Sequence, residues 1–273
     1  MTAIGLRRDE RHFYYWNGNA AVPGITTVQG VLDKPAIPNW AKKETAKAAV
    51  RNLATVTAMV NDDPVTDATL DQHPAVNYLK AMPGYQRDKA AEVGTLVHGI
   101  AESYALSETP DIPDHLAGFA DAFIRDFVEK YKPTFHPLYV EAMVYHEGAE
   151  GVVRPYGGTM DAFVEIAGEI WLIDYKTSTN KKATAAQSGW PYTDTALQLA
   201  AGRYASFIGR EDDPKKYPIP KVQRCGVVAI TPKEARLIEY EVTPVEFEAF
   251  AAARTAWDWV NQRSKEVKVK DAA

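Results

Sequence analysis

Two adjacent segments of the chain have the composition of β-strands, and the connection between them is short enough for a hairpin. Residues 159–166 and 170–176 are rich in β-branched and aromatic side chains, and a short glycine-containing connection, 167–169, separates them. Such a pattern predicts an antiparallel hairpin. The hairpin constrains the fold more than any other feature, because it defines two neighbouring strands of a sheet.

The charged residues of this hairpin gather at one end of it. Asp161 lies early in the first strand and Asp174 late in the second, so antiparallel pairing brings the two carboxylates together. Lys176 follows Asp174 by two residues, and residues two apart on a strand project from the same face. Converging carboxylates repel each other unless a cation lies between them. Their oxygen atoms suit Mg²⁺ or Mn²⁺ better than zinc.

The spacing of an acid and a lysine two residues apart has little specificity by itself. A chain of this length and charge content contains about two such triplets by chance. Two others are present, Asp213-Pro214-Lys215 in a Pro- and Lys-rich loop and Glu266-Val267-Lys268 in a charged tail. Neither follows a hairpin that carries another Asp. A solvated strand pair is the alternative interpretation of Asp174 and Lys176.

Three more polar residues accompany the hairpin. Glu141 is the single acid of another predicted strand, and His98 lies four residues after Gly94 on a predicted amphipathic helix. Gln198 lies among apolar neighbours on a predicted helix downstream, and it requires a hydrogen-bond partner if it is buried. A lone helical histidine is also typical of a satisfied residue at the edge of a core, and that alternative stays open for His98.

In this order the motifs resemble a known family. A histidine (His98), then Asp161, then Asp174 and Lys176 on a hairpin, then a helix with Gln198, are similar to the RecB-type branch of the PD-(D/E)xK nucleases. The motifs are specific as an ordered set, although each is weak singly.

The N-terminal part adds a narrower likeness, to the start of bacteriophage-encoded RecB-like exonucleases. It is carried by Pro23-Gly24-Ile25-Thr26-Thr27-Val28, followed by Lys34-Pro35 and Asn39-Trp40-Ala41. The resemblance covers residues 20–45 and 85–205, which is somewhat over half of the chain.

The resemblance implies a role for each matching residue. His98, Asp161 and Asp174 correspond to metal ligands, joined by the backbone carbonyl of Tyr175, and Lys176 corresponds to the catalytic lysine. Two further correspondences are Glu141, an acid on the first core strand and an additional candidate ligand, and Gln198, which contacts DNA or supports the lysine.

The sequence departs from the family pattern at one position. The family's tyrosine usually follows the glutamine by one helical turn, and Gly202 occupies that place. Tyr204 is the nearest tyrosine, but six residues after Gln198 it points to a different face of the helix. Either Tyr204 reaches the site from another angle or its role has been lost.

The net charge of −5 argues mildly against broad electrostatic binding to nucleic acid, so phosphate contacts require a local concentration of positive charge. Lys181 and Lys182 are the best placed, being close after Lys176, and Arg87 precedes His98. Other candidates are Lys42, Lys43, Lys47 and Lys89. Ordinary solvated side chains are the alternative for each of them.

The order of predicted elements is helices, three antiparallel strands, a helix, two strands and a helix. This favours a mixed α/β fold with a PD-(D/E)xK restriction-endonuclease-like core, a central mixed sheet flanked by helices, and an N-terminal helical region. We expect a single nuclease domain over 1–273, because a chain of 273 residues with 46% hydrophobic content can bury one large core. Its parts are a mainly helical region with the histidine motif (1–135), the catalytic αβ core (136–243), and a C-terminal helix and tail (244–273). The predicted helices cover 36–59, 87–106, 114–131 and 195–205, with another from Pro244, and the further strands cover 137–145, 222–231 and 235–242.

Several classes of protein are disfavoured by composition. No segment approaches 18 consecutive apolar residues, and residues 1–16 have no apolar signal core, so we expect a cytoplasmic protein, in the host cytoplasm if phage-encoded. Some RecB-type relatives hold an iron–sulfur cluster with four cysteines. The single cysteine, Cys225, can form neither such a cluster nor an internal disulfide.

The function expected from these residues is a divalent-metal-dependent DNA exonuclease that uses Mg²⁺ or Mn²⁺. The resemblance suggests a place in phage or bacterial DNA recombination, repair or processing, with DNA and a single-strand annealing or recombination protein as partners. Three alternatives remain: an endonuclease of the same fold, a non-catalytic DNA-binding recombination accessory protein, and a metal-dependent hydrolase of nucleotides or small phosphates. Lys176 argues against the accessory protein, because a non-catalytic chain has no use for it.

Overall fold

The computed structural model describes residues 4–32, 34, 36–63, 65–67, 69–179 and 193–267. The chain divides into two compact units, one made of Met1–Leu32 with Leu96–Ala273 and the other of Asp33–Thr95. The expectation of one domain over the whole chain stays a prediction. No helix in the described ranges is both long enough and apolar enough to cross a membrane.

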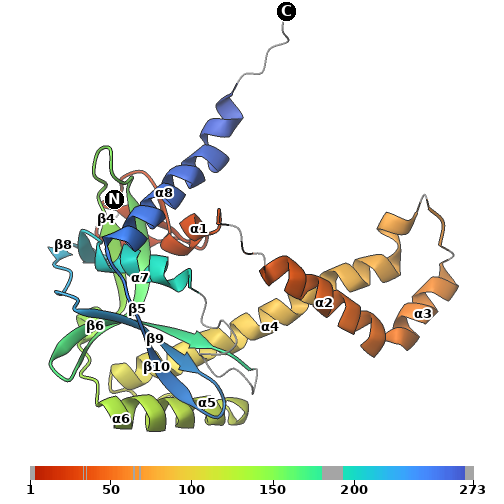
Figure 1. Cartoon of the computed structure of the whole chain (residues 1–273), viewed down its shortest axis with the longest axis horizontal. Coiled ribbons are helices and arrows are strands. Elements are labelled where there is room, and N and C mark those ends of the chain that lie inside the picture. The colour runs from red at the N-terminus through yellow and green to blue at the C-terminus, as the bar shows by residue number, and fades with distance from the viewer. Residues whose placement is uncertain are drawn as a thin grey trace, which may run out of the picture. The chain divides into compact units, whose positions relative to one another are not determined.

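The helices and strands follow one another along the chain as shown in Figure 1. They are β1 (Leu6–Arg8), β2 (Phe13–Trp16), β3 (Val22–Pro23), α1 (Ile25–Gln29), α2 (Ala36–Arg51), α3 (Leu53–Asp62), α4 (Pro74–Ala105), α5 (Ala117–Phe123), a π-helical turn (Ile124–Val128), α6 (Glu129–Tyr131), β4 (Val140–His146), β5 (Tyr156–Ile166), β6 (Glu169–Thr177), α7 (Thr195–Arg203), β7 (Phe207–Arg210), β8 (Asp213–Tyr217), β9 (Arg224–Ile230), β10 (Ala235–Tyr240) and α8 (Pro244–Asn261).

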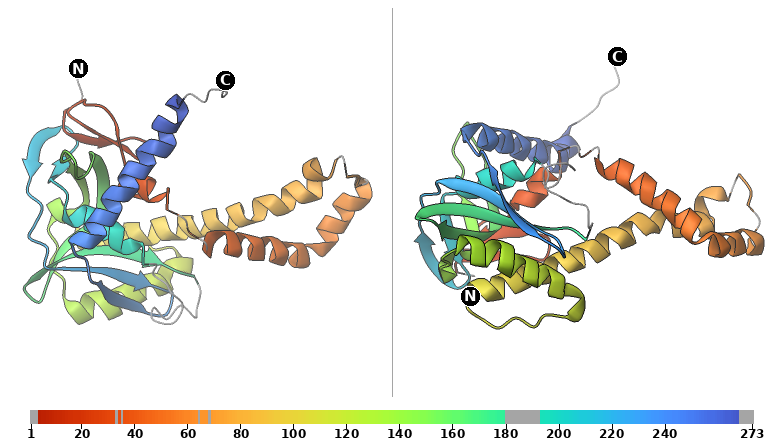
Figure 2. Two further views of the ribbon diagram at one scale, coloured as in Figure 1. Left: turned by 45° about the horizontal axis from the view of Figure 1, so that its top comes forward. Right: turned by 60° about the horizontal axis from the view of Figure 1, so that its bottom comes forward.

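The first unit is built around a seven-stranded mixed sheet with the order β10-β9-β6-β5-β4-β7-β8. Neighbouring strands are antiparallel except for β6 and β9, which run parallel. Helices α7 and α8 cover one face of the sheet, and α5 with α6 covers the other (Figures 1 and 2). The predicted mixed α/β architecture, a central sheet flanked by helices, is therefore confirmed.

The predicted hairpin is present as β5 and β6. Its register pairs Ala162 with Ile173 and Ile166 with Glu169. The turn residues Ala167 and Gly168 both have positive φ, 53° and 82°. Two consecutive residues of this kind match the right-handed twist of the strands, which is why glycine is favoured there.

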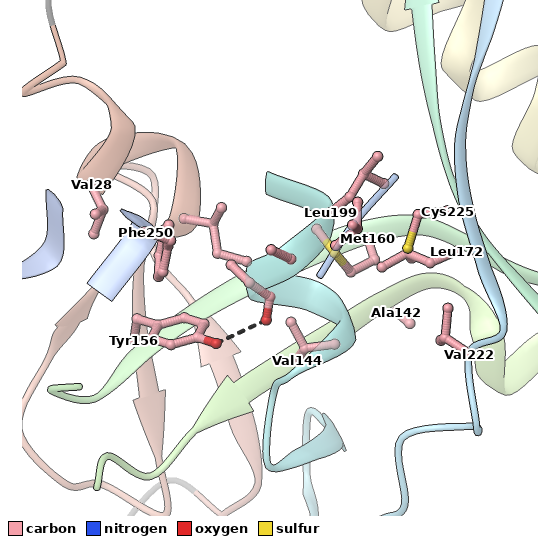
Figure 3. Close-up of a cluster of buried hydrophobic side chains, with 14 of the residues drawn as sticks. Val28, Ala142, Val144, Tyr156, Met160, Leu172, Leu199, Val222, Cys225 and Phe250 are labelled. Carbon is pink, nitrogen blue, oxygen red and sulfur yellow. Dashed lines mark hydrogen bonds between the residues drawn. The ribbon is translucent and has the colours of Figure 1, made fainter. Parts of the chain in front are cut away.

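The hairpin is held against α7 by a buried apolar cluster. Met160 of β5 and Leu172 of β6 pack with Leu199 of α7 in this cluster (Figure 3). Tyr156, at the start of β5, donates a 2.8 Å hydrogen bond from its hydroxyl to the Ala201 carbonyl (Figure 3). These contacts hold α7 against the hairpin, so that Gln198 lies at the end of the hairpin that carries Asp174 and Lys176.

A second, three-stranded sheet of β1, β2 and β3 packs on β5, and the expectation of a mainly helical N-terminal region did not include it. Its contact with β5 depends on Gly157 and Gly158. A Cβ atom at Gly157 would overlap the Tyr14 side chain, and one at Gly158 would overlap Ile25. Gly157 lets the N-terminal sheet approach the strand that carries Asp161, and Gly158 lets α1 do so.

Other predicted boundaries are wrong. The helix expected over 36–59 is two helices, because the chain leaves the helical conformation at Asn52, whose side-chain amide donates to the Ala48 carbonyl at 3.1 Å. The helix with His98 begins at Pro74, well before the expected residue 87. The segment around Pro214, expected to be a loop, is the edge strand β8.

Candidate functional site

Three metal-ligating side chains meet where α4, β4 and β5 come together. One ligand atom from each of His98, Glu141 and Asp161 lies within 4.8 Å of the others. The Nδ1 atom of His98 is 3.7 Å from Oδ1 of Asp161. An imidazole nitrogen and two carboxylate oxygens are donors that divalent cations accept. This group can therefore hold a metal ion.

Both carboxyl groups of the cluster titrate at unusually high pH. Burial, and then the charge of Asp161, raise the pKa of Glu141 to about 8. Burial, and then the charge of Asp174, raise the pKa of Asp161 to about 6, although His98 opposes the shift. Since repulsion between carboxylates contributes to both shifts, a cation between them would favour their ionised forms.

The backbone is strained at one member of the cluster. Glu141 has φ 45°, in the left-handed region, although it lies inside β4. The register of β4 with β5 pairs Val140 with Ala162 and Ala142 with Met160, and Glu141 has no paired residue on β5. A non-glycine residue in this conformation costs about 1–3 kcal/mol, and such strain is concentrated at functional sites.

A second group joins the hairpin to α7. Asp174 is 4% exposed, and its Oδ2 atom is 2.7 Å from the Lys176 ammonium. The Gln198 amide donates to Oδ1 of Asp174 at 2.6 Å, and its oxygen accepts from Lys176 at 3.4 Å. The prediction that Gln198 requires a polar partner is confirmed, and the partner is the Asp174–Lys176 pair.

This arrangement keeps Lys176 charged. Burial lowers the pKa of its ammonium, but Asp174 and then Asp161 raise it, so that the net pKa lies above the ordinary value. Lys176 is therefore a fixed cation beside the carboxylates rather than a base.

Tyr175 connects the two groups. Its amide donates a 2.5 Å hydrogen bond to Oδ2 of Asp161, across the hairpin. Its ring meets the His98 ring edge-on at 5.7 Å and the Phe123 ring at 5.6 Å. The backbone of Tyr175 thus orients Asp161, and its side chain packs on His98. The role of its carbonyl as a ligand stays a prediction.

Asp174 lies beside the cluster of His98, Glu141 and Asp161 rather than within it. Its charge is close enough to raise the pKa of both Asp161 and Glu141. Its Oδ2 atom is buried and accepts no hydrogen bond of good geometry, in spite of the nearby ammonium of Lys176. A buried carboxylate whose partner is a cation, and which lies next to other carboxylates, is suited to a site that binds cations.

The structure does not bring Tyr204 to this site. Tyr204 follows the last turn of α7, and its ring packs on Phe247 of α8 at 5.2 Å. The position one turn after Gln198 is closed to any side chain. A Cβ atom at Gly202 would overlap the Met160 sulfur and lie 3.0 Å from Leu172.

The candidate phosphate contacts lie either outside the described residues or in the unit Asp33–Thr95. Lys181 and Lys182 lie outside the described part of the chain. Arg87 belongs to the unit Asp33–Thr95, where its guanidinium is 2.8 Å from the Asp88 carboxylate. The other candidates, Lys42, Lys43, Lys47 and Lys89, belong to the same unit.

Two charged residues that act on Glu141, Glu102 and Arg8, were not among the predicted site residues. Glu102 lies one helical turn after His98, and its charge contributes to the raised pKa of Glu141. The four-residue spacing on one helix was a signal for it. Arg8, whose charge lowers the pKa of Glu141, comes from the unanticipated N-terminal sheet and had no such signal.

Comparisons with known proteins leave the family open. No protein-family model matches the chain, and no curated protein matches it significantly. Among solved structures it is similar to the crystal structure of SSO0001, with 17% identity and a TM-score of 0.32. That alignment spans 50% of this chain and 54% of the other, so about half of SSO0001 is matched. A match of this kind supports no inference about function.

Proposed function

We propose that this chain is a divalent-metal-dependent DNA exonuclease with a PD-(D/E)xK core, acting in phage or bacterial DNA recombination, repair or processing. One observation carries the proposal: the cluster of His98, Glu141 and Asp161 lies beside a lysine that is ion-paired to a buried aspartate. A metal-ligating cluster alone would fit many proteins. A cluster with a fixed ammonium beside it fits the hydrolysis of an anionic substrate.

The donor set fits Mg²⁺ or Mn²⁺. Glu141 and Asp161 supply carboxylate oxygens and His98 supplies one nitrogen, and the carboxylate of Asp174 beside them is a further oxygen donor. Oxygen-rich sites of this kind favour hard cations over zinc. A bound ion supplies charge neutralisation at the phosphate and a lowered pKa for water.

The residues of the chain supply the rest of the chemistry. Lys176 holds its charge, so it binds and polarises water and stabilises the negative charge that develops on the phosphate. Gln198 holds both Asp174 and Lys176 through one amide. Because a held cation requires no rearrangement during the reaction, its electrostatic effect is larger than that of a mobile surface lysine.

Two alternatives use the same residues differently. An endonuclease of this fold would share the site and differ in how DNA enters it. A DNA-binding accessory protein would not require the ammonium of Lys176 at the carboxylates, and the contacts of Gln198 with that pair argue against it.

The test is digestion of end-labelled linear DNA, single- and double-stranded, beside a closed circle, with Mg²⁺ or Mn²⁺ and with EDTA. We expect metal-dependent loss of the linear DNA and an intact circle. Cutting of the circle would support the endonuclease. If the folded protein cleaves no DNA in either metal, the proposal is wrong, and hydrolysis of mononucleotides should then be measured.

A further inference from the structure

The N-terminal sheet brings an arginine to the edge of the carboxylate cluster. Arg8 of β1 and Tyr14 of β2 are directly opposite each other in the antiparallel pair. Tyr14 is 3% exposed, and its hydroxyl is 2.9 Å from the Thr159 hydroxyl. Thr159 precedes Asp161 by two residues on β5. Tyr14 therefore links Arg8 to the strand that carries a cluster carboxylate.

The charge of Arg8 acts on both neighbours. Burial raises the pKa of Tyr14, and a hydrogen bond from Thr159 and the charge of Arg8 oppose that shift. Burial also raises the pKa of Glu141, and the charge of Arg8 again opposes it. Since directly opposite residues of an antiparallel pair project from the same face, Arg8 lies on the face of the N-terminal sheet where Tyr14 contacts Thr159.

Arg8 is nevertheless open to solvent. Its side chain is exposed, and no carboxylate in the described ranges forms an ion pair with it. Other arginines of this unit are paired, for example Arg224 with Glu239 and Arg254 with Asp258. An exposed arginine opposite the buried Tyr14, with no carboxylate of the described residues paired to it, is arranged to receive an anion.

The adjacent arginine, Arg7, projects from the other face of β1 and does not share the position of Arg8 beside Tyr14. Arg7 lies over the Tyr15 ring, with its guanidinium carbon 5.2 Å from the ring centre. Because successive residues of a strand point to opposite faces, Arg7 and Arg8 cannot serve the same site. Arg7 is thus a matched control, with the same charge on the same strand.

We propose that Arg8, positioned by Tyr14, is a subsite for a phosphate of the DNA strand next to the one that is hydrolysed. The proposal rests on the proposed nuclease function and names a substrate contact for it. The planar guanidinium can donate two parallel hydrogen bonds to phosphate oxygens. A contact of this kind positions the strand without reading its sequence.

The competing explanation is that Arg8 only neutralises Glu141. In that case Arg8 would change metal binding in the absence of DNA. A phosphate subsite also weakens DNA binding, even where metal binding stays as tight as in the wild type or becomes tighter. The two roles can therefore be separated by two binding measurements.

The experiment compares Arg8→Ala, Arg8→Lys and Tyr14→Phe with Arg7→Ala and the wild type. Binding of a short fluorescein-labelled DNA strand is followed by anisotropy at several salt concentrations, with Ca²⁺ replacing Mg²⁺ to suppress cleavage. We expect Arg8→Ala to bind about tenfold more weakly. The slope of log affinity against log salt should fall by about 0.7–0.9 for the lost phosphate contact.

The other variants test which property of Arg8 binds the phosphate. Arg8→Lys should keep the salt slope but recover only part of the affinity, since an ammonium cannot form the two parallel bonds. Tyr14→Phe keeps the ring that packs on Gly157 and should weaken binding less than Arg8→Ala. Arg7→Ala should bind as the wild type does. Thermal melting of each variant shows whether it is folded.

The metal measurement is calorimetric titration of Mn²⁺ into DNA-free protein. Weaker DNA binding in Arg8→Ala, with Mn²⁺ bound as tightly as in the wild type or more tightly, supports the subsite, because loss of a nearby cation favours metal binding. Unchanged DNA affinity in Arg8→Ala, or an equal loss in Arg7→Ala, overturns the subsite and leaves the nuclease proposal standing. If the wild-type protein binds no DNA at all, both the phosphate subsite and the proposed nuclease function are wrong.

Discussion

The side-chain amide of Gln198 on α7 donates a 2.6 Å hydrogen bond to Oδ1 of Asp174 on β6. The oxygen of the same amide accepts from the ammonium of Lys176, two residues further along the strand. One helical side chain therefore holds both members of the Asp-x-Lys pair. Three other ligating side chains, His98, Glu141 and Asp161, converge beside it.

Replacing Gln198 with Ala should lower the rate of DNA hydrolysis by about 10- to 100-fold, as is usual for a residue that orients groups at a metal site. The reason is that Asp174 loses a donor and Lys176 loses an anchor. The control is Gln223→Ala, because Gln223 accepts a 2.7 Å hydrogen bond from the Ile170 amide at the other end of β6. Equal loss of activity in both variants would contradict a special role for Gln198.

Lys176→Met should reduce hydrolysis by about 10²–10³-fold, because it removes the charge that stabilises the transition state. It should also lower the free energy of unfolding by about 1–3 kcal/mol, since Asp174 is left buried and partly unpaired. The double variant Asp174→Asn with Lys176→Met should recover most of that stability and none of the activity. Urea denaturation and digestion assays measure both. If the double variant is no more stable than Lys176→Met, the loss of stability does not come from an unpaired Asp174.

Gly202→Ala should destabilise the protein by about 1–3 kcal/mol, because the new methyl group meets Met160 and Leu172 in a packed core. The matched helical control is Gly99→Ala, where a Cβ atom has nothing within 4 Å. That change should stabilise the protein by about 0.5–1 kcal/mol. Urea denaturation of both variants tests the prediction, and a neutral Gly202→Ala would show that Met160 moves aside.

Metal-free protein should lose stability as the pH rises. The pKa of Glu141 is raised from 4.5 to about 8, and that of Asp161 from 3.8 to about 6. Between the ordinary and the raised pKa the folded state binds more protons than the unfolded state. The stability that these protonated groups contribute is therefore complete below about pH 4 and is lost as the pH rises through 6 to 8.

Thermal melting in EDTA across this range measures the effect. In Glu141→Gln the melting temperature should change less with pH at the high-pH end of this range. Glu165→Gln, at an exposed position of β5, should leave the pH dependence of the melting temperature unchanged. Saturating Mn²⁺ should abolish the fall of melting temperature with pH, because the metal binds the deprotonated carboxylates. Melting temperatures in EDTA that rise from pH 6 to pH 8 would contradict the cluster's electrostatics.

The elements that sequence analysis predicted well are those with strong local patterns. The hairpin, and the helix that carries Gln198, follow from alternation and helical spacing within single segments. The proximity of Asp161 and Asp174 follows from the hairpin alone. The packing of α7 on the sheet was not needed to anticipate a polar partner for Gln198.

The elements that it missed depend on distant contacts. Strands β1, β2 and β3 contain three, four and two residues, too few for a periodic pattern, and Tyr14 packs on a glycine far away in the sequence. The charged edge strand β8 contains Pro214 and lysines, features that protect sheet edges but that are also typical of loops. The left-handed conformation of Glu141 has no local signal, so only the resemblance, and no local pattern, made it a candidate ligand beside His98 and Asp161.

The most direct test of the central claim is the rate at which Asp174→Ala digests end-labelled linear DNA in Mn²⁺, measured beside the wild type. Asp174 is the partner of both Lys176 and Gln198, so its loss removes a candidate ligand and leaves the lysine without its carboxylate. We expect rapid, metal-dependent digestion by the wild type and a loss of about 10³-fold or more in the variant. Full activity in a folded Asp174→Ala protein would contradict it.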